Sequence, residues 1–305
     1  MRTTRLQAPN LAVIELTQER EEKPAPPSLV RKSTSLGHFI EYLNEEELNT
    51  ELQRLPRKEL QLVRLKQRQL QDPSAQVPDF IRQTTPITVP QTLLTQAVIR
   101  TFVFAGESAG TAVCVSPAGL LLTCSHCVAE SRAELKSKSR SWLLTSNGQP
   151  VQASCAAWDH KRDLALLQIV TAPSLFTRDG FSFFANLCLC SQAYRSTTLR
   201  SEDTEAATSG LPTGYDVLHI SDGRFRGLAP GQDVQDNSDI GALQHDCWTY
   251  WGHSGAPLIE KVSGKLIGLH SSWDDQTGMR CRGIALQAIQ EFLAEHCTAV
   301  TSRVS

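Results

Sequence analysis

Short apolar runs separated by turn-forming residues dominate the chain from residue 92 onward. Three of them follow one another over residues 97–103, 110–115 and 119–123. Runs of four to eight residues rich in Val, Leu and Ile, with turn residues between them, are typical of β-strands. Further runs of this kind cover residues 163–170, 214–220 and 265–270. The pattern therefore predicts a large region built from β-strands.

A helical pattern precedes this region, over residues 37–71. Asn44 can cap a first helix and Glu47, three residues later, completes the motif of a capping box. Pro56 ends that helix, and a second helix is predicted over residues 57–71. The first helix is rich in acidic residues and the second in basic ones, so the pair is expected to be oppositely charged.

These patterns divide the chain into five segments. They are a flexible N-terminal segment (1–36), a helical pair (37–71), a Pro-rich linker (72–91), a β-rich domain closed by a helix over 286–297 (92–298) and a tail (299–305). The helical pair is consistent with three roles: a hairpin packed on the β domain, an autoinhibitory clamp, or a docking arm for a protein partner.

Composition narrows the classes of function. The chain has 305 residues, a formal net charge of −2 and 40% apolar residues, so neither nucleic acid nor a membrane is an expected partner. Neither a run of ~18 apolar residues nor a signal-peptide core is present. Nine cysteines are an odd number and do not suggest a disulfide framework. We expect an intracellular, most simply cytoplasmic, protein with reduced thiols.

Three motifs carry the candidate chemistry. Ser254 lies in the sequence Gly-His-Ser-Gly-Ala-Pro, where a serine between glycines can occupy a tight turn near a substrate. His126 follows the apolar run 119–123 in the sequence Thr-Cys-Ser-His-Cys, and Asp163 begins the sequence Asp-Leu-Ala-Leu-Leu. The order along the chain is histidine, aspartate, serine, which differs from the order in subtilisins and α/β-hydrolases.

These motifs resemble those of the chymotrypsin/trypsin-like serine proteases of the PA clan, over about residues 92–298. The pattern is similar to that of disulfide-poor, glutamyl endopeptidase-like members. The resemblance implies two six-stranded antiparallel β-barrels with a C-terminal helix, preceded here by the helical extension. It implies a triad of His126, Asp163 and Ser254, an oxyanion hole made by the N–H groups of Gly252 and Ser254, polypeptide substrates and no cofactor.

The resemblance also bears on specificity. Trypsins have an aspartate six residues before the nucleophile, whereas this chain has Trp248, so cleavage after Arg or Lys is disfavoured. His253 replaces the aspartate that zymogens use for activation. Thr249 and His270 occupy positions similar to the substrate-binding Thr and His of glutamyl endopeptidases. Both can donate hydrogen bonds, so we expect cleavage after Glu or, second, Gln.

Two alternatives stay open. Four residues, Cys188, Cys190, His245 and Cys247, have a spacing that could supply zinc ligands, although a histidine nine residues before the serine also occurs in zinc-free relatives. The chain could also be a binding or regulatory module that keeps the protease fold with low or no turnover. The triad residues favour the enzyme, a serine endopeptidase.

Overall fold

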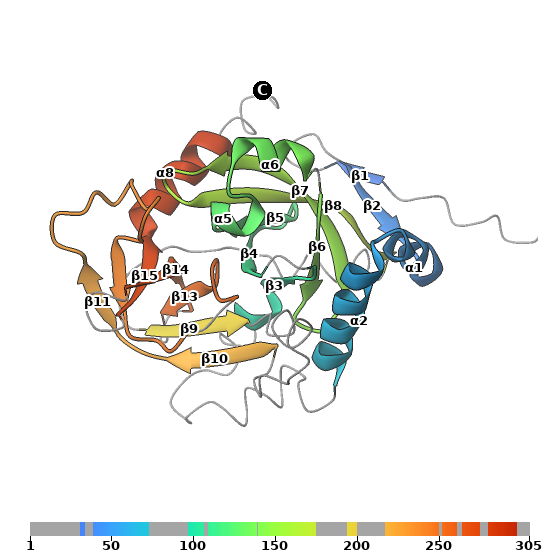
Figure 1. Cartoon of the computed structure of the whole chain (residues 1–305), viewed down its shortest axis with the longest axis horizontal. Helices are drawn as coiled ribbons and strands as arrows, with labels where there is room; N and C mark the ends of the chain where they lie inside the picture. Colours follow the sequence, from blue (N-terminus) through green and yellow to red (C-terminus); the bar gives the residue numbers. More distant parts are fainter. Residues whose placement is uncertain are drawn as a thin grey trace, which may run out of the picture.

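The computed structural model describes residues 31–33, 39–72, 97–106, 109–138, 140–174, 194–199, 217–249, 252–260, 264–274 and 280–297. These residues form two β-sheets, a pair of N-terminal helices, the short helices α5 (Ser125–Val128) and α6 (Arg132–Ser137), and a C-terminal helix (Figure 1). The first sheet lies between the N-terminal helices and the second sheet (Figure 1).

The first sheet closes into an antiparallel barrel of six strands. Its strands are β3 (Thr101–Phe104), β4 (Thr111–Ser116), β5 (Leu120–Thr123), β6 (Ser141–Thr145), β7 (Pro150–Asp159) and β8 (Leu164–Pro173). They follow the order β8-β5-β4-β3-β6-β7, and the pairing of β7 with β8 closes the barrel. Every residue of β3 and β5 is buried, which explains why these strands appear in the sequence as continuous apolar runs.

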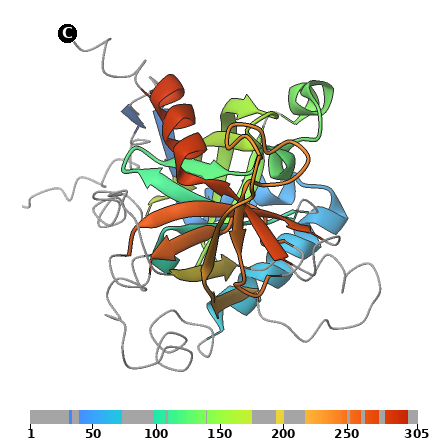
Figure 2. The ribbon, with the colours of Figure 1, turned by 90° about the vertical axis from the view of Figure 1, so that its left-hand side faces the viewer.

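The second sheet is antiparallel and has seven strands. They are β9 (Tyr194–Leu199), β10 (Leu218–Asp222), β11 (Phe225–Leu228), β12 (Leu243–His245), β13 (Pro257–Glu260), β14 (Leu266–Asp274) and β15 (Arg280–Ala285). The order is β10-β9-β13-β14-β15-β12-β11, and register shifts in β13 and β14 mark bulges that bend a sheet. Figure 2 looks onto this sheet. Within the described residues it is an open half-barrel, whereas the sequence predicted a second closed barrel of six strands.

Helix α8 (Leu286–Cys297) follows β15 and joins the two β units. Its bounds agree with the helix predicted from the sequence. Ala288, Ile289 and Phe292 belong to the same apolar core as the first barrel. On the outside, Glu295 accepts hydrogen bonds from Arg162 Nη1 at 2.8 Å and Nη2 at 2.6 Å. The expected mostly-β architecture with a C-terminal helix is thus confirmed.

The N-terminal extension contains strands as well as the predicted helices. Strands β1 (Arg31–Ser33) and β2 (Phe39–Leu43) pair with each other, and β2 adds to the first sheet in parallel with β8. Residues 39–43 are therefore a strand, not the start of a helix, because β8 offers them a free edge that local sequence does not reveal. Likewise, residues 31–33 lie in the segment expected to be flexible.

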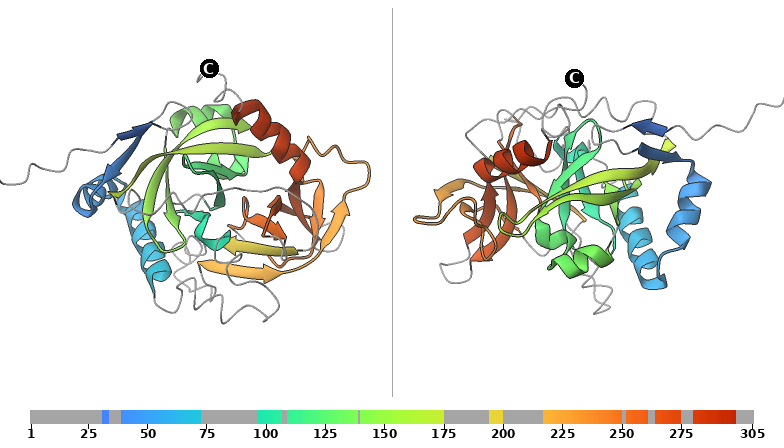
Figure 3. Two further views of the ribbon diagram at one scale, coloured as in Figure 1. Left: turned by 180° about the vertical axis from the view of Figure 1, so that it is seen from behind. Right: turned by 90° about the horizontal axis from the view of Figure 1, so that it is seen from above.

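The helices α1 (Glu45–Gln53) and α2 (Arg57–Gln71) begin where the sequence predicts. The capping box is formed: Asn44 Oδ1 accepts from Glu47 N at 2.9 Å, and Glu47 Oε2 accepts from Asn44 N at 2.9 Å. The apolar stripes of both helices form one core with the outer face of the first barrel. This core contains Leu52, Val63 and Leu70 of the helices and Val103 and Leu144 of the barrel. Figure 3 shows the helices on the side of this barrel away from the second sheet.

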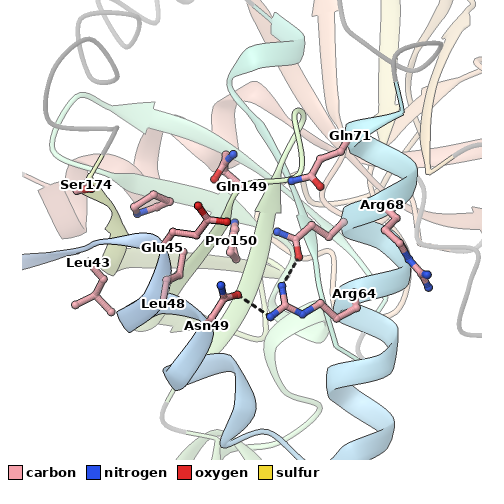
Figure 4. Close-up of a pocket in the computed structure, with 12 residues that line it drawn as sticks. Leu43, Glu45, Leu48, Asn49, Arg64, Arg68, Gln71, Gln149, Pro150 and Ser174 are labelled. Atoms are coloured by element: carbon pink, nitrogen blue, oxygen red, sulfur yellow. Dashed lines mark hydrogen bonds between the residues drawn. The ribbon is translucent and has the colours of Figure 1, made fainter.

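A cavity of about 760 Å³ lies between the two helices and the turn that joins β6 to β7 (Figure 4). Arg64 reaches into it and donates to Asn49 Oδ1 at 2.7 Å and to Gln67 Oε1 at 3.0 Å. None of the candidate catalytic residues lines this cavity.

Two further observations complete the fold. Residues 97–99, expected to begin a strand, form a single helical turn, and Thr101 Oγ1 donates to Ala97 O at 2.8 Å.

Every helix among the described residues is too short or too polar to cross a lipid bilayer.

Candidate active site

His126 and Asp163 form a directly bonded pair at one end of the first barrel. His126 lies on the short helix α5 (Ser125–Val128), which follows β5, and Asp163 lies in the turn between β7 and β8. His126 Nδ1 is 2.9 Å from Asp163 Oδ1 and 3.0 Å from Oδ2. Asp163 also accepts from Ser125 Oγ at 2.9 Å and from His126 N at 3.2 Å, both at Oδ1.

The backbone of Asp163 is as specialised as its side chain. Its φ of +54° is the left-handed conformation, which aspartate tolerates better than most residues do. Its carbonyl accepts from Ser125 N at 3.1 Å, so the turn and the start of α5 are locked together. Only 6% of Asp163 is exposed, and a buried carboxylate with several donors is held in a single orientation.

Two cysteines tune the charge of His126. Burial lowers the pKa of His126, but the charge of Cys127 and the hydrogen bond to Asp163 raise that pKa more, to a net value well above 6.5. The pKa of Cys127 is itself lowered, first by a hydrogen bond with Cys124 and then, against the effect of burial, by the charge of His126. His126 and Cys127 thus form a coupled pair in which each favours the charged form of the other.

This coupling predicts a shift in the pH dependence of any reaction that needs His126 as a base. A base must be neutral, so activity falls as the pH drops through the pKa of His126. Cys127→Ser removes the group whose charge raises that pKa, and is expected to move the acidic limb of kcat/KM to lower pH. A pH profile of kcat/KM checks this. Cys155→Ser, at a half-buried thiol on β7, is the control and should leave the limb in place.

Ser254 lies on a tight loop of the second β unit that contacts the first barrel. Gly252 and Gly255 on either side have φ of +90° and +83°, values that favour glycine. Ser254 O accepts from Thr111 N at 2.8 Å and from the thiol of Cys127 at 3.4 Å. The loop that carries the serine therefore contacts the residue next to His126.

The serine hydroxyl has its own acceptor. Ser254 Oγ donates to the carbonyl of Ser271 on β14 at 3.0 Å. Among the hydrogen bonds of the described residues, none joins this hydroxyl to the ring of His126.

One side-chain and two backbone hydrogen bonds hold the peptide groups of the loop that carries Ser254. Gly252 O accepts from Thr111 Oγ1 at 3.1 Å, His253 O accepts from Ala256 N at 2.8 Å, and Gly255 N donates to His270 O at 2.8 Å. No hydrogen bond within the described part of the chain uses the N–H of Gly252 or of Ser254. These are the two N–H groups that the sequence predicts to bind an oxyanion.

The predicted substrate-binding residues lie in the second sheet, and both are buried. Each is 2% exposed; Thr249 Oγ1 is 3.1 Å from Cys281 Sγ, and His270 Nδ1 is 3.1 Å from His245 Nε2. Burial lowers the pKa of His270 well below its usual value and that of His245 to about 4, so both rings are neutral near pH 7. Trp248 is 42% exposed and stacks edge-on against His253.

Only some of the possible zinc ligands belong to the described residues. Cys188 and Cys190 lie outside the described residues. His245 is engaged with His270, and Cys247 is buried. A second set, Cys124, His126 and Asp163, places a sulfur, a nitrogen and an oxygen within 4.8 Å of one another. The bonds between His126 and Asp163 already use two of these three atoms.

Three residues of this site were not identified from the sequence. Ser125 binds Asp163, Thr111 binds the serine loop, and Ser271 accepts from the serine hydroxyl. Ser125 directly precedes the predicted histidine, and this position could have identified it as a residue of the site. No local pattern marks Thr111 or Ser271, because each acts on a residue far away in the chain.

Comparison with known protein families gives a match. The profile of the family described as "Trypsin-like peptidase domain" matches residues 110–269, about half of the chain. Among curated proteins, no significant sequence match is found.

Solved structures with a similar fold include two proteases. One is the Rv3671c protease from M. tuberculosis in its active form, with 16% identity, a TM-score of 0.46, and coverage of 70% of this chain and 87% of the other. The other is the HtrA-type protease AlgW with a decapeptide, with 18% identity, a TM-score of 0.42, and coverage of 64% and 52%. The family profile spans the segments that carry His126, Asp163 and Ser254, and this chain belongs to the trypsin-like peptidase family.

Proposed function

We propose that this protein is a serine endopeptidase in which Ser254 is the nucleophile, His126 the general base and Asp163 the residue that orients the base. The observation that carries the proposal is the pair of short contacts between His126 Nδ1 and the Asp163 carboxylate, 2.9 and 3.0 Å. They leave Nε2 as the proton acceptor. The serine loop contacts Cys127, next to this ring.

In this mechanism the hydroxyl of Ser254 leaves the carbonyl of Ser271 and turns to the ring of His126. Its oxygen then attacks the peptide carbonyl while its proton passes to Nε2. The negative charge that forms on the carbonyl oxygen is stabilised by the N–H groups of Gly252 and Ser254. The leaving amine takes the proton from His126, and water hydrolyses the acyl-enzyme by the same steps.

We propose further that the enzyme cleaves after Glu or Gln. The neutral ring of His270 contacts His245 through Nδ1, and when Nδ1 accepts that hydrogen bond the proton is on Nε2. The ring can then donate to a carboxylate or carboxamide oxygen of the substrate, as can the hydroxyl of Thr249. Trp248 stands at the position where trypsins have an aspartate that attracts Arg or Lys, so we do not expect cleavage after basic residues.

The test is cleavage of a complex peptide library by the full-length protein beside Ser254→Ala, with the new termini identified by mass spectrometry. We expect cuts that disappear in the variant, with Glu or Gln before the cleaved bond. The absence of cuts by the wild type would favour the binding-module alternative. An unchanged cleavage preference in His270→Ala would contradict the specificity while leaving the endopeptidase intact.

A further inference from the structure

Lys66 is a fully buried lysine that ties the helical extension to the first barrel. It lies on α2, is 0% exposed, and its ammonium donates to Phe104 O and Gly106 O, both at 3.0 Å. Burying an ammonium group is costly unless it is fully bonded, so this position is specialised. Glu59, two turns earlier on the same face of α2, lies against Gly106 as well, since a Cβ on that glycine would come within 2.6 Å of Glu59 Oε1.

The two carbonyls that Lys66 binds lie at the end of β3 and at the start of the turn between β3 and β4. Phe104 N donates to Gly110 O at 3.0 Å across this turn, and Ala105 N donates to Trp142 O at 2.9 Å. At its far end, Gly110 is packed so closely that a Cβ there would be 2.8 Å from Cys127 Sγ. The described residue at the start of this turn, Gly106, thus contacts the helical extension, and the one at its end, Gly110, contacts the helix of His126.

The residue after this turn holds the serine loop. Thr111 donates from Oγ1 to Gly252 O at 3.1 Å and from N to Ser254 O at 2.8 Å. Its own carbonyl accepts from Thr123 Oγ1 at 2.6 Å. These bonds set the planes of the peptides that follow Gly252 and Ser254, and hence the geometry of the loop that carries the nucleophile.

We infer that Lys66 is a positioning residue for the serine loop, and that the helical extension is a built-in part of the catalytic unit. The contacts run from Lys66 to the carbonyls of the β3–β4 turn, through Thr111, to the carbonyls of Gly252 and Ser254. The inference rests on the proposed function of Ser254. It assigns the helical pair a role that neither an autoinhibitory clamp nor a passive hairpin has.

The test compares Lys66→Met with Arg68→Met on the same helix. Methionine replaces most of the apolar stem of lysine but has no donor. Arg68 is exposed and lies on the same helix, at the rim of the cavity in Figure 4, so it serves as the matched control. We expect Lys66→Met to lower kcat about 10-fold or more with little change in KM, because a small misplacement of catalytic groups is costly in rate. Arg68→Met should leave both constants unchanged.

Two readouts separate positioning from general stability. Thr111→Val should lower kcat in the same way, and Lys66→Met combined with Thr111→Val should cost less than the product of the two single effects, because both act through one path. Independent effects that multiply would contradict the inference. Hydrogen exchange of Lys66→Met should be faster at Gly255 and Ala256, whose N–H groups donate to His270 O and His253 O, but not in the Arg68→Met control.

Hydrogen exchange also distinguishes this inference from the proposed function. Unchanged exchange at residues 252–256 in Lys66→Met would overturn the inference whatever the activity. Faster exchange together with no hydrolysis by the wild type would support the coupling and overturn the endopeptidase. If Lys66→Met does not fold, Lys66→Gln, which retains a neutral donor on a shorter side chain, is expected to show faster exchange at residues 252–256 than the wild type, and no increase would overturn the inference.

Discussion

Asp163→Asn is expected to lower kcat/KM roughly 10⁴-fold while the protein stays folded. The carboxylate of Asp163 accepts from His126 Nδ1, from His126 N and from Ser125 Oγ. A carboxamide that presents its NH₂ group to the ring would favour the tautomer with the proton on Nε2, and that tautomer cannot take a proton from Ser254. It would also remove the negative charge that stabilises the imidazolium.

The backbone of Asp163 makes this substitution a clean test. A φ of +54° would be strained for most side chains, but asparagine adopts it as readily as aspartate. The turn between β7 and β8 should therefore keep its conformation. We expect the thermal unfolding midpoint to change little while kcat/KM falls.

The measurement is kcat/KM on a peptide found in the library, with thermal unfolding of the same samples. Ser125→Ala is the control, since it removes one donor to the carboxylate and leaves both bonds from His126. A loss of less than 10-fold in Asp163→Asn would show that another group orients His126.

The sequence predicted those parts of the fold that depend on local signals. The capping box of Asn44 and Glu47 and the closing helix over 286–297 are present as expected. It was wrong at residues 97–99, because a short apolar stretch has the same pattern in a buried helical turn as in a buried strand. It also missed the pairing of β2 with β8, which joins residues about 130 positions apart, as in Glu41 with Thr171.

The same distinction applies to the site. His126, Asp163 and Ser254 stand in motifs that are recognised from neighbouring residues alone. The bond of Lys66 to Phe104 O joins residues 38 positions apart, and that of Thr111 to Gly252 O joins residues 141 positions apart. Both donors bind backbone carbonyls. Because every residue has a backbone carbonyl, the residue type at the acceptor position does not reveal the hydrogen bond.

Gly255→Ala is expected to lower kcat/KM by at least about 10²-fold and to destabilise the fold. A Cβ at this position would overlap the carbonyl oxygen of Thr111 and approach Thr123 Oγ1 to 2.6 Å. The carbonyl belongs to the backbone of β4 and cannot rotate away, so the serine loop itself must move. That movement would break the bond from Thr111 N to Ser254 O and displace the N–H of Ser254 from the position an oxyanion needs.

Gly231→Ala separates this close approach from backbone strain. Gly231 has φ of +77° and Gly255 has φ of +83°, so alanine is strained similarly at both positions, at a cost of about 1–2 kcal/mol. No atom lies within 4 Å of a Cβ built on Gly231. The measurement is kcat/KM and the unfolding midpoint of both variants. Equal losses of activity would mean that backbone strain alone explains the effect, whereas a loss confined to Gly255→Ala would show that contact with Thr111 holds the nucleophile in place.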